Sequence, residues 1–215
     1  MIFRDREAAG QALAALLADY AHRDDTIVLA LPRGGVPVAK EIALALDAPL
    51  DVLVVRKLGL PWQPEFAAGA IAPGGVLVLN PEAKAEIPGL NRLLEPVVTQ
   101  ERRELARREA VYRRGRPPLA VGGRTVILVD DGIATGATME AAAIAMRVLN
   151  ARSIVIAVPV APPATIQRLA LHADRVVCAE QPVDFIAVGQ YYDDFPQLND
   201  DEVVQLLAPG KPAMD

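Results

Sequence analysis

The sequence predicts an α/β fold in which a parallel sheet is flanked by helices, and two observations support this prediction. Short runs of aliphatic residues alternate along the chain with longer segments whose apolar residues recur at helical spacing. The short runs are apolar at almost every position, as is typical of strands buried on both faces of a parallel sheet. Because right-handed crossovers bring the carboxyl ends of such strands to one edge, we expect ligand-binding residues at that edge.

Each predicted element follows from its local pattern. Continuous apolar runs predict strands at 26–32, 50–57, 125–131, 153–160 and 174–180. Apolar residues at helical spacing predict helices at 6–21, 35–46, 138–150, 163–173 and 200–208. The segment 80–118 breaks this alternation and is predicted to be a helical insertion within a single domain of residues 1–215. Segments 31–35, 56–57 and 130–138 are expected at the carboxyl ends of strands.

The composition indicates a globular chain with an aliphatic core. Hydrophobic residues make up 52% of the 215 positions, and aromatic residues make up only 4%. The formal net charge of −5 makes a broad nucleic-acid-binding surface unexpected. The single cysteine fits a cytoplasmic protein without a disulfide framework. There is no apolar run of about 18 residues and no signal-peptide core, so we expect no membrane partner.

Several enzyme classes are disfavoured because the residues that they need are scarce. The only serine, Ser153, opens an apolar run, which argues against a serine hydrolase. The two histidines, His22 and His172, are far apart in sequence and lack a cysteine cluster, which argues against a zinc site. Cys178 lies in an apolar segment and is interpreted as a buried thiol rather than a nucleophile.

The segment VILVDDGIATGATM, residues 126–139, combines a strand, a turn and the start of a helix. It is not a Walker A loop, because Ala137 stands where lysine would be needed, and it lacks the G-x-G-x-x-G dinucleotide pattern. Gly132 and Gly136 allow the backbone to approach a ligand closely, and two threonines supply hydroxyl groups. Together with the N–H groups of the helix start, these features predict a phosphate-binding loop.

The acid pair Asp130 and Asp131 precedes this loop and cannot serve the phosphate itself, because like charges repel. Carboxylates are strong hydrogen-bond acceptors for sugar hydroxyls, so the pair favours a vicinal diol next to the phosphate. A phosphate with a vicinal diol describes a ribose 5-phosphate. The alternative is that Asp131 only caps the following helix, although two acids exceed what a cap needs.

This motif resembles the signature of the type I phosphoribosyltransferases, in which a hydrophobic strand is followed by two acids and a short Gly/Thr loop. The resemblance implies an α/β phosphoribosyltransferase fold and covers roughly residues 24–80 and 120–200. It implies that Asp130 and Asp131 are the catalytic acids that hold the 2- and 3-hydroxyls of phosphoribosyl pyrophosphate (PRPP). It also implies that the 5-phosphate is bound, mostly by backbone N–H groups, at Ala134, Thr135, Gly136, Ala137 and Thr138.

Two further segments extend the resemblance. The segment LPRGG follows the first strand where the family has its pyrophosphate loop, which implies that Arg33 and Gly34 contact pyrophosphate and that a non-proline cis peptide occurs there. The segment VVRKLGLP follows the next predicted strand, which implies pyrophosphate contacts from Arg56 and Lys57. Independently of the family, these cations suit a pyrophosphate leaving group with Mg²⁺. The alternative for each is a solvated surface cation.

The segment 178–200 resembles the hood of the purine salvage members of the family. The resemblance implies that Phe185 stacks on a base, that the Ile186 backbone faces it, and that Asp193 lies near the metal with Asp130 and Asp131. Core packing is an equal alternative for Phe185, because the chain has few aromatic residues.

Two departures from the purine enzymes leave the acceptor open. Ala134 stands where the 6-oxopurine enzymes carry an acid, and no lysine occurs near 158–163 to read a 6-oxo group. Seven arginines lie between residues 102 and 116 of the insertion, and we expect a solvated helix face there, with a pyrophosphate lid or an RNA-contacting face as alternatives.

We therefore expect a Mg²⁺-dependent transferase of ribose 5-phosphate from PRPP to an unidentified nitrogen acceptor, such as a nucleobase, with release of pyrophosphate. The alternative is a non-catalytic PRPP-sensing regulator that binds nucleic acid or a partner protein. A homodimer is a further expectation that the sequence leaves open.

Overall fold

The computed structural model describes residues 2–60 and 62–208, so the predicted domain of residues 1–215 extends beyond the described residues. Within them, five parallel strands form a central sheet in the order β2-β1-β6-β7-β8. These strands are β1 Thr26–Ala30, β2 Leu50–Val52, β6 Thr125–Val129, β7 Ser153–Val160 and β8 Arg175–Glu180. β1 pairs with β6 from Thr26 opposite Thr125 to Ala30 opposite Val129, so their carboxyl ends lie side by side. The predicted α/β fold with a parallel sheet is confirmed.

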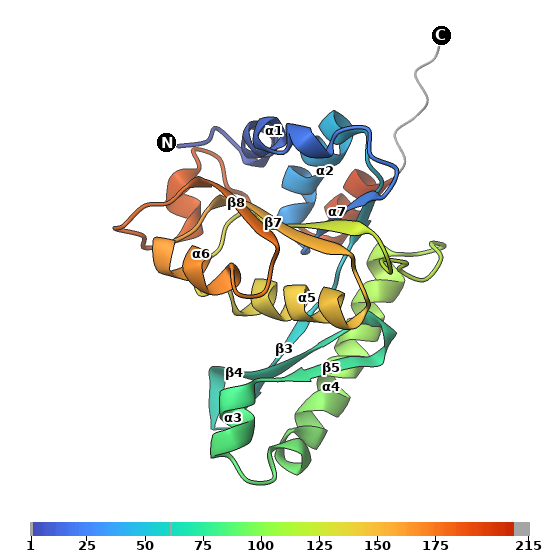
Figure 1. Ribbon diagram of the computed structural model, residues 1–215, viewed down its shortest axis with the longest axis vertical. Helices are drawn as coiled ribbons and strands as arrows, with labels where there is room; N and C mark the ends of the chain where they lie inside the picture. Colours follow the sequence, from blue (N-terminus) through green and yellow to red (C-terminus); the bar gives the residue numbers. More distant parts are fainter. Residues whose placement is uncertain (1, 61, 209–215) are drawn as a thin grey trace.

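Helices cover both faces of this sheet (Figure 1). Val28 and Ile127 pack into one core layer with α1 Arg6–Leu16, α2 Gly35–Leu46 and α7 Asp200–Leu207. Leu29 and Leu128 alternate to the opposite face and pack against α5 Ala137–Val148 and α6 Pro163–Leu169. Every residue of β1 and β6 is buried, which explains why both strands are apolar throughout. Short 3-10 turns complete this part of the fold at η1 Ala18–Tyr20 and η3 Val188–Tyr191.

A second, antiparallel sheet lies beyond α5 and was not anticipated from the sequence (Figure 1). It consists of β3 Arg56–Leu60, β4 Gln63–Ala72 and β5 Val76–Leu79, with η2 Pro73–Gly75 between the last two strands. The single strand predicted at 50–57 is therefore wrong. β2 ends at Val52, the buried residues Leu53 and Val54 connect the sheets, and Arg56 pairs with Ile71 of β4. The break is invisible in the sequence because the connecting residues are as apolar as the strand.

The segment 80–118 contains two helices, α3 Pro81–Glu86 and α4 Leu90–Tyr112. α4 is 23 residues long and lies along the antiparallel sheet, with Leu94, Val98 and Leu105 on its buried stripe. It runs from the far end of that sheet back to the central sheet (Figure 1). None of the helices in residues 2–60 and 62–208 has both the length and the apolar character of a membrane span.

The carboxyl end of α4 is fixed to the central sheet by arginines. Arg113 donates two hydrogen bonds to Asp51 of β2, at 3.0 and 2.9 Å, and its side chain is only 10% exposed. Arg116 donates to the backbone carbonyl of Leu50 and lies 3.3 Å from the same Asp51 carboxylate. Neither arginine belongs to a solvated helix face. Both join α4 to the edge strand of the sheet.

Replacing Arg113 by methionine should lower the free energy of unfolding by about 2 kcal/mol, because Asp51 keeps only Arg116 to offset its partly buried charge. Urea denaturation would measure the change. The matched control is Arg114→Met at the exposed neighbouring position, where we expect little effect. Equal losses in the two variants would show that the ion pair with Asp51 does not hold the helix in place.

Candidate active site

Asp130 and Asp131 follow the last residue of β6, at the edge where the carboxyl ends of β1 and β6 meet. The Asp130 carboxylate accepts a hydrogen bond from the backbone N–H of Asp131 at 2.9 Å. Both residues are only partly exposed. The pair therefore lies where a parallel sheet presents its ligand site.

Asp131 is held from two directions by residues that the sequence did not single out. Arg6, the first residue of α1, donates from Nε to Oδ2 of Asp131 at 2.8 Å. The hydroxyl of Tyr192 donates to the backbone carbonyl of Asp131 at 2.5 Å. Burial raises the pKa of the Tyr192 hydroxyl, so it remains a donor. Both the side chain and the backbone of Asp131 are thus fixed in place.

The turn between β1 and α2 packs directly on the acid pair. A Cβ atom added to Gly34 would lie 1.9 Å from Oδ2 of Asp131, and one added to Gly35 would lie 2.6 Å from the carbonyl oxygen of Val129. Only glycine permits so close an approach. The peptide bond between Pro32 and Arg33 is cis, at the place where the family resemblance implied one. The Arg33 side chain is exposed.

The two carboxyls of the pair differ in their electrostatic surroundings. Burial raises the pKa of Asp130 well above its usual range, and the negative charge of Asp131 raises it further. Burial also raises the pKa of Asp131, but the Arg6 guanidinium opposes that rise. Burial therefore favours the protonated form most strongly at Asp130, whereas at Asp131 the Arg6 guanidinium favours the charged form.

The loop 132–138 lies beside the acids and has the geometry of an anion cradle. Gly136 adopts a left-handed φ of 72° immediately before α5. The hydroxyl of Thr165 donates to the carbonyl of Ala134 at 2.7 Å, and Arg168 donates to the carbonyl of Thr135. Because a trans peptide points its C=O and N–H in opposite directions, the N–H groups that follow these carbonyls face away from α6.

A pocket of about 180 Å³ opens at this loop. It is lined by Asp130, Gly132, Ile133, Ala134, Thr135, Gly136, Ala137, Thr138 and Met139. The first N–H groups of α5 have no acceptor within the helix and lie at this pocket, where they favour an anion. The structure thus brings the five residues predicted for the 5-phosphate together with one of the predicted catalytic acids.

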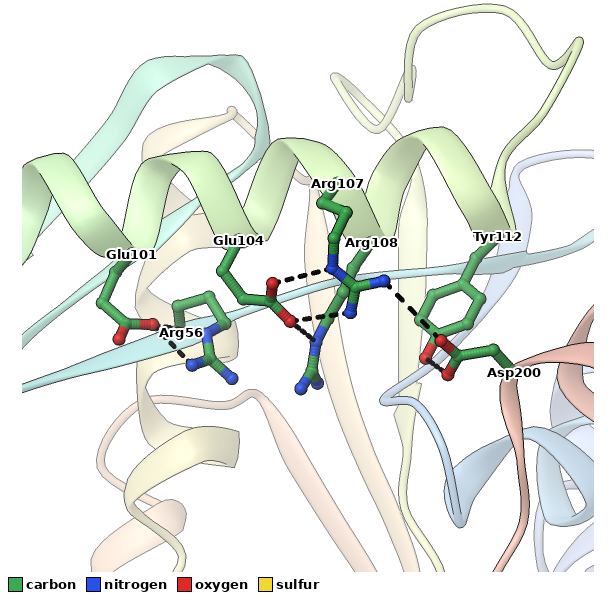
Figure 2. Close-up of polar contacts among 7 residues, drawn as sticks. All are labelled: Arg56, Glu101, Glu104, Arg107, Arg108, Tyr112 and Asp200. Carbon is green, nitrogen blue, oxygen red and sulfur yellow. Dashed lines mark hydrogen bonds and ion pairs between the residues drawn. The ribbon is translucent and has the colours of Figure 1, made fainter.

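Two of the predicted pyrophosphate cations lie on a different strand from the one that the sequence suggested. Arg56 and Lys57 begin β3 of the antiparallel sheet instead of ending β2. Figure 2 shows Arg56 bonded to Glu101 of α4, with the Arg56 Nε 2.6 Å from the carboxylate. The same helix carries Glu104, which accepts from Arg107 and Arg108, so that the pKa of Glu104 falls to about 2.

A cavity of about 650 Å³ lies along this charged face of α4, with Arg56 on its wall. Tyr112, at the end of the face, donates to Asp200 of α7 at 2.6 Å (Figure 2). Arg107 and Arg108 therefore have acidic partners within the protein. This is the solvated, salt-bridged surface that helical spacing predicts.

The predicted hood residues lie in the segment that follows β8. Phe185 stacks on Tyr191, with ring centroids 5.7 Å apart and planes 8° from parallel, and Ile186 is exposed. Asp193 is exposed, and its N–H donates to the carbonyl of Phe3. Within residues 2–60 and 62–208, no group of three or more acids, histidines or cysteines is arranged to hold a metal, so Asp193 does not complete such a cluster with the acid pair.

Arg6 is the site residue that sequence reasoning missed, although one local signal was present. Arg6 stands in the first turn of a helix, where the dipole disfavours a cation, and it follows the N-cap Asp5. A buried arginine at this position indicates a tertiary carboxylate partner. Thr165, Arg168 and Tyr192 offered no such signal, because their contacts join segments that are distant in sequence.

Replacing Gly34 by alanine should lower the free energy of unfolding by about 2 kcal/mol, because the new Cβ would overlap a carboxylate that Arg6 holds in place. The control is Gly122→Ala, where the nearest atom to a new Cβ would be 3.8 Å away. Urea denaturation would compare the two. If Gly34→Ala unfolds with the same free energy as the control, the turn and the acid pair are not packed together.

Replacing Asp130 by asparagine should stabilise the protein increasingly as the pH rises. A carboxyl whose pKa is raised on folding binds more protons in the folded state, so stability falls as the pH rises from about 4 through the folded pKa. Asparagine does not titrate, and its oxygen can still accept from the Asp131 N–H. Melting temperatures at about pH 5 and about pH 8 would show the widening difference. The prediction is wrong if the melting temperatures of the variant and the wild type differ by the same amount at both pH values, as expected for the exposed control Asp24→Asn.

Comparisons with known proteins agree with this geometry. The family described as "Phosphoribosyl transferase domain" matches residues 3–195. A Mycobacterium tuberculosis protein named "Putative phosphoribosyl transferase Rv0571c" is 48% identical over 206 residues, which are 96% of this chain and 46% of that protein. The chain thus spans about half the length of the curated relatives it matches.

Two solved structures extend the comparison. The structure of TT1426 from Thermus thermophilus is 47% identical, with a TM-score of 0.88, and covers 96% of this chain and 98% of its own. A hypoxanthine-guanine phosphoribosyltransferase from Bacillus anthracis shares the fold at 11% identity, with a TM-score of 0.50 and coverage of 86% of this chain and 85% of its own. On the family match and these relatives, the chain belongs to the phosphoribosyl transferase family.

Proposed function

We propose that this chain transfers ribose 5-phosphate from PRPP to a nitrogen acceptor and releases pyrophosphate in a Mg²⁺-dependent reaction. The observation that carries the proposal is the packing of three elements around one carboxylate. Asp131 is bonded to Arg6, lies against the Gly34 backbone and follows Asp130, which lines the pocket of the phosphate-binding loop. The acids proposed for the diol, the loop proposed for the phosphate and the turn proposed for pyrophosphate therefore lie next to one another.

In this proposal the loop Ala134–Thr138 binds the 5-phosphate through the N–H groups at the start of α5. Asp130 and Asp131 accept hydrogen bonds from the two ribose hydroxyls, which fixes the sugar ring between the loop and the turn at Gly34. Departure of pyrophosphate leaves positive charge on the ring. A charged carboxylate beside the ring would favour this charge, and the fixed position of the sugar lowers the entropic cost of the attack.

The donors present fit a magnesium ion that arrives with the substrate. Mg²⁺ typically uses one or two protein carboxylates together with substrate phosphates, so the absence of a larger acidic cluster among the described residues is compatible with it. When bound, the ion would neutralise charge on the leaving pyrophosphate. Asp130 and Asp131 are the carboxylates proposed to approach it, and Arg33 and the Gly34 backbone are proposed to contact the pyrophosphate itself.

The acceptor is proposed to enter from the side of the hood, over Phe185 and the exposed Ile186. Phe185 already stacks on Tyr191, which gives it a partner within the protein in place of a base. Ala134 offers no acid for proton exchange with a purine, so we expect hypoxanthine and guanine to be poor acceptors. Arg56 and Lys57 remain proposed pyrophosphate contacts. To reach the pyrophosphate, Arg56 would first have to break its hydrogen bond to Glu101.

A second candidate function is a regulator that binds PRPP without turning it over. Two observations favour it: the phosphate loop carries no acid at Ala134, and Arg56 is engaged by Glu101 instead of facing the acid pair as a free cation. Such a protein would bind PRPP through the same acids and loop.

The central experiment is calorimetric titration with PRPP of the wild type and of the Asp130→Asn, Asp131→Asn double variant. Each charge-assisted hydrogen bond to a hydroxyl should contribute about 1.5–3 kcal/mol, so we expect affinity to fall at least about tenfold. Asp24→Asn, at an exposed position away from the site, should bind as the wild type does. Unchanged affinity in the double variant would remove the diol assignment.

The two candidate functions separate in an assay of pyrophosphate release from PRPP with Mg²⁺. The acceptors to include are hypoxanthine, guanine, adenine, uracil, orotate and small amines. Release with one of them supports the transferase. Tight PRPP binding without release from any acceptor supports the regulator.

A further inference from the structure

We propose that Arg6 is a positioning residue for the ribose site and that it couples the hood to Asp131. The inference rests on the proposed function and extends it to a residue outside the acid motif. The guanidinium of Arg6 bonds to Oδ2 of Asp131 at 2.8 Å and to the carbonyl of Pro196 at 2.8 Å. It also lies 3.8 Å from the centre of the Phe195 ring. One side chain thus joins the acid pair to the end of the hood.

The burial of Arg6 points to a role beyond stability. Arg6 is 8% exposed, and its partner Asp131 has a side chain that is 14% exposed. Removing two charges from water costs about as much free energy as their attraction returns, so apolar residues of similar size often hold a fold equally well. A buried ion pair is therefore better explained by the orientation it imposes on Asp131 than by the stability it adds.

The geometry leaves Asp131 with one way to face a sugar. Arg6 occupies Oδ2, and the backbone of Gly34 packs against the same oxygen. Rotation of the carboxylate would break the ion pair and press an oxygen into the turn. Arg6 bonds to Oδ2 and not to Oδ1, so we expect a ribose hydroxyl to bond to Oδ1, whose direction this ion pair fixes. Such preorganisation is worth most where a substrate must be held for attack.

The hood is connected to the same residue by a second route. Tyr192 donates its hydroxyl to the carbonyl of Asp131 and stacks on Phe195, with ring centroids 4.8 Å apart. Phe3 packs on Tyr192 and exchanges backbone hydrogen bonds with residues 191 and 193 of the hood. The N-terminal segment and the hood therefore form one packed unit, which contacts Asp131 through hydrogen bonds from both Arg6 and Tyr192. A displacement of the hood would therefore act on Asp131 through these two contacts.

The test uses three variants and three ligands. Arg6→Gln removes the charge, Arg6→Lys keeps it, and Arg4→Gln changes an exposed arginine whose side chain bonds to the neighbouring Asp5. Calorimetry would measure binding of PRPP, ribose 5-phosphate and inorganic phosphate. The last ligand fits the loop but has no ribose hydroxyls, so a role confined to Asp131 leaves its affinity unchanged.

We expect Arg6→Gln to weaken PRPP and ribose 5-phosphate about tenfold each, with phosphate unaffected, because a charge-assisted contact orients the diol acceptor. Arg6→Lys should recover most of that loss, and Arg4→Gln should match the wild type. Equal weakening of all three ligands, or no recovery with lysine, would overturn the inference by showing a general structural role.

A double-mutant cycle with Asp131→Asn gives an independent readout. If Arg6 acts through Asp131, the Arg6→Gln change should cost little further affinity once Asp131 is asparagine. Additive losses would overturn the inference. Wild-type protein that fails to bind PRPP would refute the proposed function itself, whereas wild-type binding with unaltered Arg6→Gln affinity would refute only the role of Arg6.

Discussion

The close approach of two turns is the constraint on which the rest of the site depends. Gly34 and Gly35 bring the start of α2 against the end of β6, so that no side chain separates them from Asp131 and Val129. Because β1 and β6 are neighbouring strands in register, the approach is set by the sheet itself and not by mobile loops. The diol acids and the turn that precedes α2 therefore share one rigid frame.

The site places ionisable side chains in buried positions, where apolar side chains would make the fold more stable. Asp130 is a carboxyl whose charged form is disfavoured by burial, and at Asp131 the buried Arg6 opposes the same effect of burial. Neither arrangement improves the core that packs on both sides of the sheet. Local destabilisation of this kind is common where a protein must receive a polar ligand, since the ligand supplies the missing partners.

The parts of the site that are local in sequence could be predicted, whereas those made by tertiary contact could not. The strand, acid pair and loop of residues 126–139 form one continuous pattern, and the structure places them as that pattern indicates. The strand predicted at 50–57 failed because Leu53 and Val54 are buried in a connection and not in a strand. Arg6 is 125 residues from Asp131, a separation that no periodicity reveals. The sequence pattern around Arg113 and Arg116 is that of surface charges, but in the structure both form ion pairs with Asp51.

The antiparallel sheet packs against the long helix α4, so a tilt of this helix would move the sheet with it. A helix of 23 residues is about 35 Å long, and here its carboxyl end is clamped to β2 and α7 by Arg113, Arg116 and Tyr112. A tilt of about 10° around that clamp would carry the opposite end through about 6 Å. Arg56, bonded to Glu101 partway along the shaft, would travel a shorter path with it. A change in the angle of α4 would therefore also change the distance between this cation and the acid pair.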